Sequence, residues 1–153
     1  MSNQASMQAR IDADLRAAMR SQDTVSKLAL RAVKTALTEA SKAGEAHELD
    51  DSQIVAVIQR EAKRRREAAA EYKRMGATAQ AAQEEAELAV LERYLPRPLG
   101  EAEVETLARQ VIAETGAASV RELGKVMPVL MNRVDGRADG KLVSQVVRRL
   151  LGG

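Results

Sequence analysis

The sequence predicts an all-α protein made of two parts, and three observations carry that prediction. Aromatic side chains are almost absent, with two Tyr and neither Phe nor Trp among 153 residues, so the core has to be built from Leu, Val, Ile, Ala and Met. Charged residues make up 30% of the chain, and the abundance of Ala, Glu, Leu and Arg is typical of helical proteins. No stretch alternates apolar and polar residues with β-branched enrichment, so no strand is expected.

The segment from Glu92 to Leu99 predicts the boundary between the two parts. Pro96 and Pro98 each lack a backbone donor and push the preceding residue toward extended geometry. One helix therefore has to end before them, and Gly100, followed by acidic residues, can cap the next. We expect an N-terminal helical domain over residues 1–95, with longer helices and a helical hairpin, and a small C-terminal domain of three helices over residues 96–153.

The N-terminal part opens with two amphipathic helices, because apolar residues recur there every three or four positions. The first is expected over residues 7–20 with Met19 on its buried face, and the second over residues 24–42 with Leu28 on its buried face. The loop that follows holds His47, the single histidine of the chain. A surface position without a role is a simpler interpretation of this histidine than a base or a metal ligand.

A helical hairpin is expected next. Asp50 as N-cap and Gln53 at the third position form a capping box for a helix that ends at Gly76. A second helix starts near residue 78 and runs to the proline segment. Its buried face is expected to hold Ala82, Ala86, Ala89, Val90, Leu91, Tyr94 and Leu95. The tip of the hairpin, near residues 66–85, has little but Ala to bury, so we expect it to project and to be the more mobile end.

Three short helices around a small core are expected in the C-terminal part. Ser119 and Glu122 predict a capping box at the start of the second of them. Pro128 interrupts the apolar pattern of that helix, so a short turn followed by a new helix through Val134 is favoured over one straight helix. Asp139 can cap the last helix.

The residue inventory predicts no catalytic residue, no metal site and no cofactor. Without Cys, the chain can form no disulfide, thiolate metal site or Cys nucleophile, and no glycine-rich phosphate loop follows a strand. Glu84, Glu85 and Glu87 form a group of carboxylates, for which a solvated face paired with nearby cations is the simpler interpretation. No apolar run approaches the ~20 residues of a membrane span, and the N-terminus lacks a signal-peptide core. A soluble, cytoplasmic protein is expected.

Cations of the first hairpin helix are one candidate set of phosphate contacts. This helix carries five Lys and Arg within seven positions, from residue 60 to residue 66. Arg65 falls on the buried face, where an ion pair with Glu61 of the same helix is the simplest interpretation. A solvated face and a phosphate-binding face both remain open for the outward cations. These candidates are Lys63, Arg64 and Arg66.

The C-terminal part holds the second candidate set. From Arg121 to Gly153, seven Lys and Arg stand against three Asp and Glu, a net charge of +4, whereas the whole chain carries +2. Cations beside the glycines of the loop could follow a phosphate backbone. Without aromatic residues nearby, recognition has to rest on RNA shape and phosphates. The candidate RNA-binding residues here are Lys125, Arg133, Arg137, Lys141, Arg148 and Arg149.

Several motifs together resemble the GatB/YqeY family. They are Gln-Arg-Glu-Ala-Lys-Arg-Arg-Arg over residues 59–66, Tyr-Leu-Pro over 94–96, Gly-Lys-Val-Met over 124–127 and Gly-Arg-Ala-Asp-Gly-Lys-Leu-Val over 136–143. Their order and spacing match the free-standing YqeY-like proteins over nearly the whole chain, although Pro128 departs from the commoner small residue at that position. The family is all-helical, with a larger N-terminal region and a small three-helix C-terminal region, so the resemblance implies the same fold.

The resemblance also implies a role beside tRNA. Related domains form the tail of a subunit of the glutamine-dependent aminoacyl-tRNA amidotransferase and, in some bacteria, an extension of glutaminyl-tRNA synthetase, where they help to hold tRNA. A non-catalytic tRNA-binding accessory protein is implied, with aminoacyl-tRNA synthetase or amidotransferase components as further partners. Carbon–nitrogen ligase activity with glutamine as amido donor enters only as the family's label, because the catalytic parts of those enzymes have no counterpart here. The alternatives are a helical protein–protein adaptor without RNA binding and, last, an independent amidotransferase.

Overall fold

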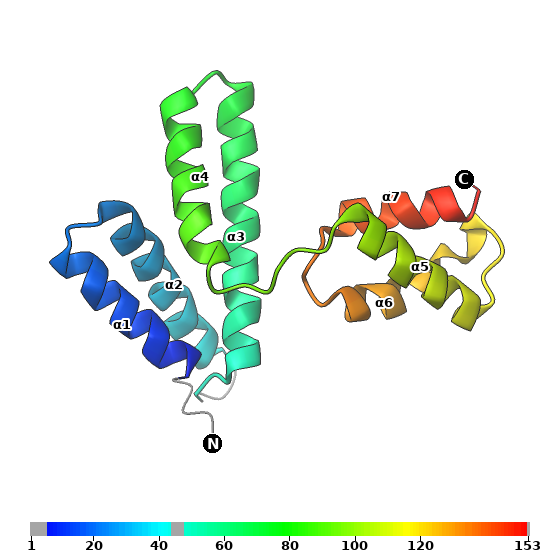
Figure 1. Cartoon of the computed structure of the whole chain (residues 1–153), viewed down its shortest axis with the longest axis horizontal. Helices are drawn as coiled ribbons and strands as arrows, with labels where there is room; N and C mark the ends of the chain where they lie inside the picture. The colour runs from blue at the N-terminus through cyan, green and yellow to red at the C-terminus, as the bar shows by residue number, and fades with distance from the viewer. Residues whose placement is uncertain (1–5, 44–47, 153) are drawn as a thin grey trace. The chain divides into compact units, whose positions relative to one another are not determined.

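The computed structural model describes residues 6–43 and 48–152, and the regular structure within these ranges is entirely helical (Figure 1). The all-α prediction is confirmed. His47 lies outside the described residues. None of the described helices is both long enough and apolar enough to span a membrane. The chain divides into two compact units, residues 1–95 (unit 1) and residues 96–153 (unit 2), which are described here one at a time.

Unit 1 consists of two helix pairs that share one core (Figure 1). Helix α2 packs against α3 and α4, and α1 packs against α2 and α3. The helices are α1 (Met7–Arg20), α2 (Thr24–Lys42), α3 (Asp51–Arg74) and α4 (Thr78–Glu92). The core is closed by aliphatic side chains from all four helices and by one aromatic ring, that of Tyr94.

Side chains at the helix starts explain why α2 and α3 begin where they do. The carboxylate of Asp23 accepts the backbone N–H of Ser26 at 3.1 Å. At α3 the predicted capping box is present: Asp50 accepts the N–H of Gln53 at 2.8 Å, and the Gln53 side chain accepts the N–H of Asp50 at 2.9 Å. Each such cap stabilises its helix by about 1 kcal/mol because it satisfies an amide that lacks a partner in the helix.

Two apolar residues predicted to be buried in unit 1 are exposed. Met19 of α1 is 49% exposed and Leu28 of α2 is 43% exposed. Both lie near the turn between α1 and α2, and α2 meets the rest of the unit instead through Leu30, Val33 and Leu37. Helical periodicity identified an apolar stripe here that is wider than the surface its neighbours cover.

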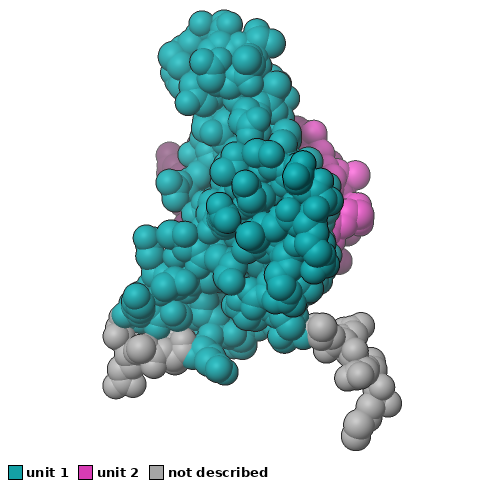
Figure 2. Space-filling model, turned by 90° about the vertical axis from the view of Figure 1, so that its left-hand side faces the viewer, with its two compact units in different colours: residues 1–95 teal, residues 96–153 magenta. Residues whose placement is uncertain are grey.

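Helices α3 and α4 form the predicted hairpin, whose tip extends beyond the α1–α2 pair (Figure 1). The 24 residues of α3 make a helix ~36 Å long. Figure 2 shows the tip as a narrow projection from the broader base of unit 1. The predicted buried face of α4 is wrong at two positions: Ala82 and Ala89 are exposed, whereas Ala81 and Glu87 are buried. The charged Glu87 faces α3, so the buried face of α4 could not be identified from apolar residues alone.

Unit 2 is built from three α-helices and one short 3₁₀ turn. The elements are α5 (Glu101–Thr115), η1 (Val120–Glu122), α6 (Leu123–Val134) and α7 (Gly140–Leu150). Helix α5 packs against α6 and α7, which also pack against each other. The core is dominated by Val, with Val104, Val111 and Val143 fully buried. Gly116 ends α5 in the left-handed conformation, with φ of +70°, which glycine adopts without steric cost.

Two predictions of local structure in unit 2 are wrong. Ser119 makes no side-chain cap, and the carboxylate of Glu122 instead accepts the backbone N–H of Ala118 at 3.0 Å. Pro128 lies inside a continuous α6 rather than at the start of a new helix. On α6, Val126, Leu130 and Val134 are all fully buried on both sides of the proline. Each such burial is worth roughly 1.5–3 kcal/mol, which together outweighs the ~3 kcal/mol that an interior proline costs.

Candidate nucleic-acid interface

The outer face of α3 carries a row of cations. Arg60, Lys63 and Arg66 are three residues apart, and each step turns the side-chain direction by ~60° while advancing ~4.5 Å along the helix. All three are exposed, and in the described parts of the chain none of them has an ion-pair partner. Arg64 stands beside this row and pairs with Glu61 at 3.2 Å, although its own side chain is 77% exposed. The outward direction predicted for Lys63, Arg64 and Arg66 is confirmed.

Arg65 points the other way, into the contact between α3 and α4. Its Nη1 donates to Glu87 Oε2 at 3.0 Å and lies 3.4 Å from Glu84 Oε2. The side chains of Arg65 and Glu87 are only 14% and 10% exposed. The predicted pair with Glu61 is wrong, and Glu87 does not belong to a solvated face.

This buried pair fixes how the outward cations are presented. Arg65 Nε is buried and has no hydrogen-bond partner, so the guanidinium is held by its carboxylate contacts alone. The pair joins α3 to α4 at a point where the other buried residues nearby are alanines, Ala69 and Ala81. With Arg65 turned toward α4, the direction of Lys63 and Arg66 on the same helix follows from the 100° turn per residue.

Two of the six candidate cations of unit 2 are paired with carboxylates of α5. Arg133 pairs with Glu114 through both guanidinium nitrogens, one of them at 3.0 Å. The Arg133 guanidinium holds the pKa of Glu114 below its usual range. Arg149 lies between two acidic residues of α5, with Nη1 at 2.8 Å from Glu101 Oε1 and Nη2 at 3.0 Å from Glu105 Oε2.

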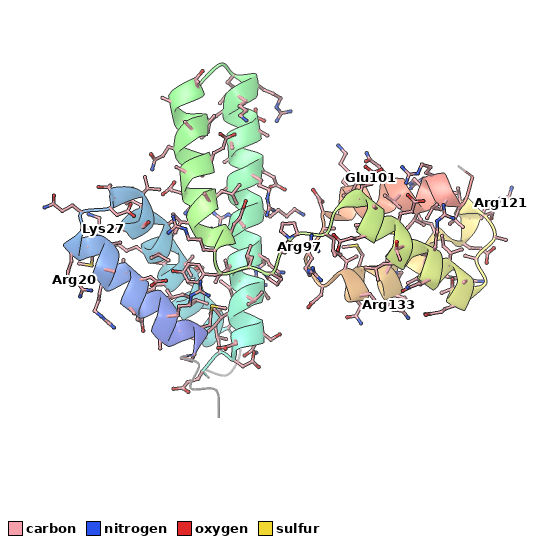
Figure 3. The ribbon with its side chains drawn as sticks, in the orientation of Figure 1. Arg20, Lys27, Arg97, Glu101, Arg121 and Arg133 are labelled. Atoms are coloured by element: carbon pink, nitrogen blue, oxygen red, sulfur yellow. The ribbon has the colours of Figure 1, made fainter. Side chains whose placement is uncertain are left out.

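The loop between α6 and α7 is tied to the segment before α5. Arg137 Nε donates to the carbonyl oxygen of Arg97 at 2.9 Å, and the N–H of Leu99 donates to the carbonyl of Arg137 at 2.8 Å. Arg97, labelled in Figure 3, makes two hydrogen bonds of 3.0 Å to Glu103. Arg137 is therefore a structural contact of unit 2 and not a free loop cation.

The three remaining candidates of unit 2 differ from one another. Lys125 Nζ pairs with Glu122 at 3.1 Å. Arg148 Nε donates to Ser144 Oγ at 3.4 Å. The Lys141 ammonium has no polar partner in the described residues, while its backbone N–H bonds the Asp139 carboxylate that caps α7. Of the six candidates, Lys141 alone presents a cation without a contact in the described part of unit 2.

The acidic residues of α5 explain why the net charge counted from Arg121 to Gly153 overestimated the free positive charge of unit 2. Residues 96–153 hold nine Lys and Arg and seven Asp and Glu, a net charge of +2, whereas the window starting at Arg121 gave +4. Four of those acids lie on α5, before the window, and the fold pairs three of them, Glu101, Glu105 and Glu114, with the C-terminal cations. Exposed pairs of this kind are worth about 0.2–1 kcal/mol each, so they can open, but a phosphate has to displace a carboxylate first.

Chemistry beyond ionic contacts has little support here. The described residues contain no group of three His, Cys, Asp or Glu side chains that could hold a metal ion. Tyr94 is buried and Tyr72 is half-buried, so neither ring is fully exposed for base stacking. Of the candidate cations named from the sequence, Lys63, Arg66 and Lys141 carry no ion pair in the described structure.

An all-helical chain of two small units, with a projecting hairpin in the first, is the class of protein that this structure defines. The chain matches the family described as Yqey-like protein over residues 8–151 and belongs to that family. The resemblance drawn from its motifs is thus confirmed. It is also similar to a protein of Pyrenophora tritici-repentis (strain Pt-1C-BFP) named "Altered inheritance of mitochondria protein 41, mitochondrial". The two are 29% identical over 147 residues, which cover 94% of this chain and 80% of the relative.

Proposed function

We propose that this YqeY-like protein is a non-catalytic tRNA-binding factor whose main phosphate contacts come from the outer face of α3. The observation that supports this assignment is the row of Arg60, Lys63 and Arg66, which are exposed and unpaired in the described structure. The first and the last are six positions apart, about 9 Å along the helix, so the row can reach successive phosphates of one strand. Each cation that neutralises a phosphate releases condensed counterions, which favours binding.

Unit 2 has the secondary role in this proposal, which reverses the weight that the sequence gave to the two sets. Lys141 can meet a phosphate directly, whereas Arg133 and Arg149 first have to leave the carboxylates of α5. That exchange lowers the net gain per contact by the value of the lost pair, about 0.2–1 kcal/mol. Arg137 is left out of the interface because it binds the carbonyl of Arg97.

The proposal takes tRNA as the ligand from the family resemblance and shape recognition from the surface itself. With Tyr94 buried and Tyr72 half-buried, the protein has no fully exposed Tyr ring on which unpaired bases could stack, so it would follow the backbone of a structured RNA. Any carbon–nitrogen ligase chemistry would reside in partner proteins, the aminoacyl-tRNA synthetase or amidotransferase components. The proposed compartment is the cytoplasm, where such RNA and enzymes meet.

Filter binding tests the ligand class. The full chain is titrated against a tRNA transcript and against an unstructured RNA of equal length at the same salt concentration. Shape recognition predicts at least about tenfold tighter binding of the tRNA, because flexible RNA has to be ordered before its phosphates match a rigid helix face. Equal affinities would refute recognition of tRNA, and the absence of any RNA binding would refute the whole proposal.

A further inference from the structure

A second surface of unit 1, distant along the chain from the α3 row, is a cleft between α1 and α2. The cleft has a volume of about 430 Å³ and lies at the end where the two helices join. It is lined by Ala18, Met19, Gln22, Thr24, Lys27 and Arg31. We infer that this cleft docks an acidic amphipathic helix of a partner protein, a role that goes beyond RNA binding and does not depend on it.

Exposed apolar surface at this end of unit 1 is the first argument. Met19 lines the cleft and is 49% exposed, and Leu28, 43% exposed, lies on α2 within one turn of both Thr24 and Arg31. They are two of only four large apolar side chains that are exposed in the described structure. Met19 lies in the lining and Leu28 lies beside it on α2, outside the lining; exposed apolar side chains gathered in this way mark an interaction site, whereas single ones need no explanation.

Charge is the second argument, and it selects the chemistry of the partner. The lining of the cleft includes Lys27 and Arg31 and no carboxylate. Arg16 and Arg20 lie on α1 nearby, and no ion pair is found for any of these four cations within the described residues. Arg20 and Lys27 extend from their helices on the side away from the hairpin (Figure 3).

The carboxylates closest in sequence do not neutralise these cations. Asp23 is engaged as the N-cap of α2, accepting the N–H of Ser26 at 3.1 Å and its hydroxyl at 2.6 Å. Hydrogen bonds from Ser26 lower the pKa of Asp23, which therefore stays ionised in that cap. Asp12 pairs with Lys34 at 2.9 Å, and this pair first and the charge of Arg16 after it lower the pKa of Asp12. Arg20, Lys27 and Arg31 are therefore the cations left without a carboxylate in the described residues. The rim of the cleft thus keeps a positive charge that its own unit does not satisfy.

An acidic amphipathic helix would match both the exposed apolar surface and the positive charge of the cleft, whereas RNA or an anionic bilayer would match only one of them. A partner helix with apolar side chains three or four residues apart can fill the cleft while flanking carboxylates meet Lys27 and Arg31. RNA would satisfy the cations and leave Met19 and Leu28 uncovered. An anionic bilayer is flat and would not enter a concave cleft between two helices.

Gln22 offers a way to separate binding from folding. It lies in the turn between α1 and α2 with φ of +58°, in the left-handed region where a non-glycine residue costs roughly 1–2 kcal/mol. Its side chain lines the cleft. Gln22→Gly therefore relieves backbone strain while removing a lining side chain, so the variant should unfold no earlier than the parent and still bind the partner more weakly.

The test begins with a random peptide library displayed on phage and selected on the full-length protein. We expect enriched peptides in which Asp or Glu flank Leu, Ile, Met or Phe at spacings of three or four residues. One such synthetic peptide is then measured by fluorescence anisotropy against the parent and the double variant Lys27→Glu/Arg31→Glu. The double variant should bind at least about tenfold more weakly, and a peptide with its acids changed to Lys should regain affinity for it.

The control variant is Lys63→Glu/Arg66→Glu, which makes the same charge change on the outer face of α3. It should keep the peptide affinity and lose RNA binding, whereas Met19→Glu should do the reverse. Enriched peptides without acidic residues, or unchanged affinity in the Lys27 and Arg31 variant, would overturn the inference. So would loss of tRNA binding or of binding to anionic phospholipid vesicles in that variant while peptide binding persists, because the cleft would then serve RNA or lipid.

Discussion

Replacing Arg65 with Ala should destabilise the hairpin far more than replacing any other cation of α3. Arg65 Nη1 lies 3.0 Å from Glu87 Oε2, and both side chains are almost completely buried between α3 and α4. The alanine variant leaves the Glu87 carboxylate in that position without its counter-charge. It also leaves few apolar contacts to hold the tip, because the buried residues beyond this pair are Ala69 and Ala81.

The expected cost follows from how much water reaches the pair. Removing one partner of a fully buried ion pair costs about 3–5 kcal/mol, because the remaining charge is left desolvated. With side chains 14% and 10% exposed, some water can reach Glu87, which places the cost at the lower end, about 3 kcal/mol. Replacing both partners with Met removes the charges and keeps the volume, so Arg65→Met/Glu87→Met should change stability by less than about 1 kcal/mol or increase it.

Hydrogen exchange followed by mass spectrometry measures this cost locally. In Arg65→Ala, amides of the hairpin tip should open about a hundredfold more often, the factor that corresponds to about 3 kcal/mol, while amides of unit 2 exchange as in the parent. Arg64→Ala is the matched control, since its pair with Glu61 is exposed and should be worth less than about 1 kcal/mol. The reasoning fails if Arg65→Ala exchanges like Arg64→Ala, or if the double Met variant is as unstable as Arg65→Ala.

Three further predictions concern single positions. The hydroxyl of Tyr94 donates to the carboxylate of Asp14, and burial raises the pKa of Tyr94 above its usual value near 10. The raised pKa means that the folded state favours the neutral phenol of Tyr94. The contribution of this phenol to stability is complete below about pH 10, where an unfolded Tyr is also neutral, and is lost as pH rises above that value. Tyr94→Phe should lower the free energy of unfolding by about 1 kcal/mol at neutral pH, and its urea midpoint should fall less than that of the parent above pH ~10. Pro128→Ala restores a hydrogen bond inside α6 and should stabilise unit 2 by about 2 kcal/mol after the looser unfolded chain is counted, and a lower melting temperature would contradict this. Gly116→Ala should cost about 1 kcal/mol in urea unfolding, because φ is +70° while no atom lies within 4 Å of the added Cβ, and an unchanged midpoint would refute the strain argument.

Sequence reasoning succeeded at one local determinant of structure, the start of α3, although the equally local pair of Ser119 and Glu122 forms no capping box. The capping box of Asp50 and Gln53 lies within four residues, and it is present in the structure as predicted. It failed where neighbours decide: Pro128 is accommodated because the core holds both halves of α6, and Leu28 is exposed because no helix covers that part of α2 in the described structure. Periodicity indicates which residues share a face, but the packing partner determines how much of that face is buried.

The candidate site was predictable on one helix and not across helices. The outward direction of Lys63 and Arg66 follows from the turn of α3 once Arg65 is placed on the buried face. The ion pairs that engage Arg133 and Arg149 do not follow from any local pattern. Arg133 and Glu114 are 19 residues apart, and Arg149 and Glu101 are 48 residues apart. Arg60 belongs to the same cluster of five cations, and its spacing of three from Lys63 and of six from Arg66 could have placed it among the outward candidates.

The salt dependence of tRNA affinity tests most directly the claim that α3 makes the main phosphate contacts. Two triple-alanine variants remove three positive charges each: Arg60, Lys63 and Arg66 in one, and Lys125, Arg133 and Arg149 in the other. Since both lose the same net charge, any difference between them reports where the phosphates lie. Filter binding across a salt series should show the slope of log affinity against log salt reduced by about 2–3 units in the α3 variant and by less than about 1 unit in the unit 2 variant. Equal slopes in the two variants, or the larger reduction in the unit 2 variant, would contradict the account.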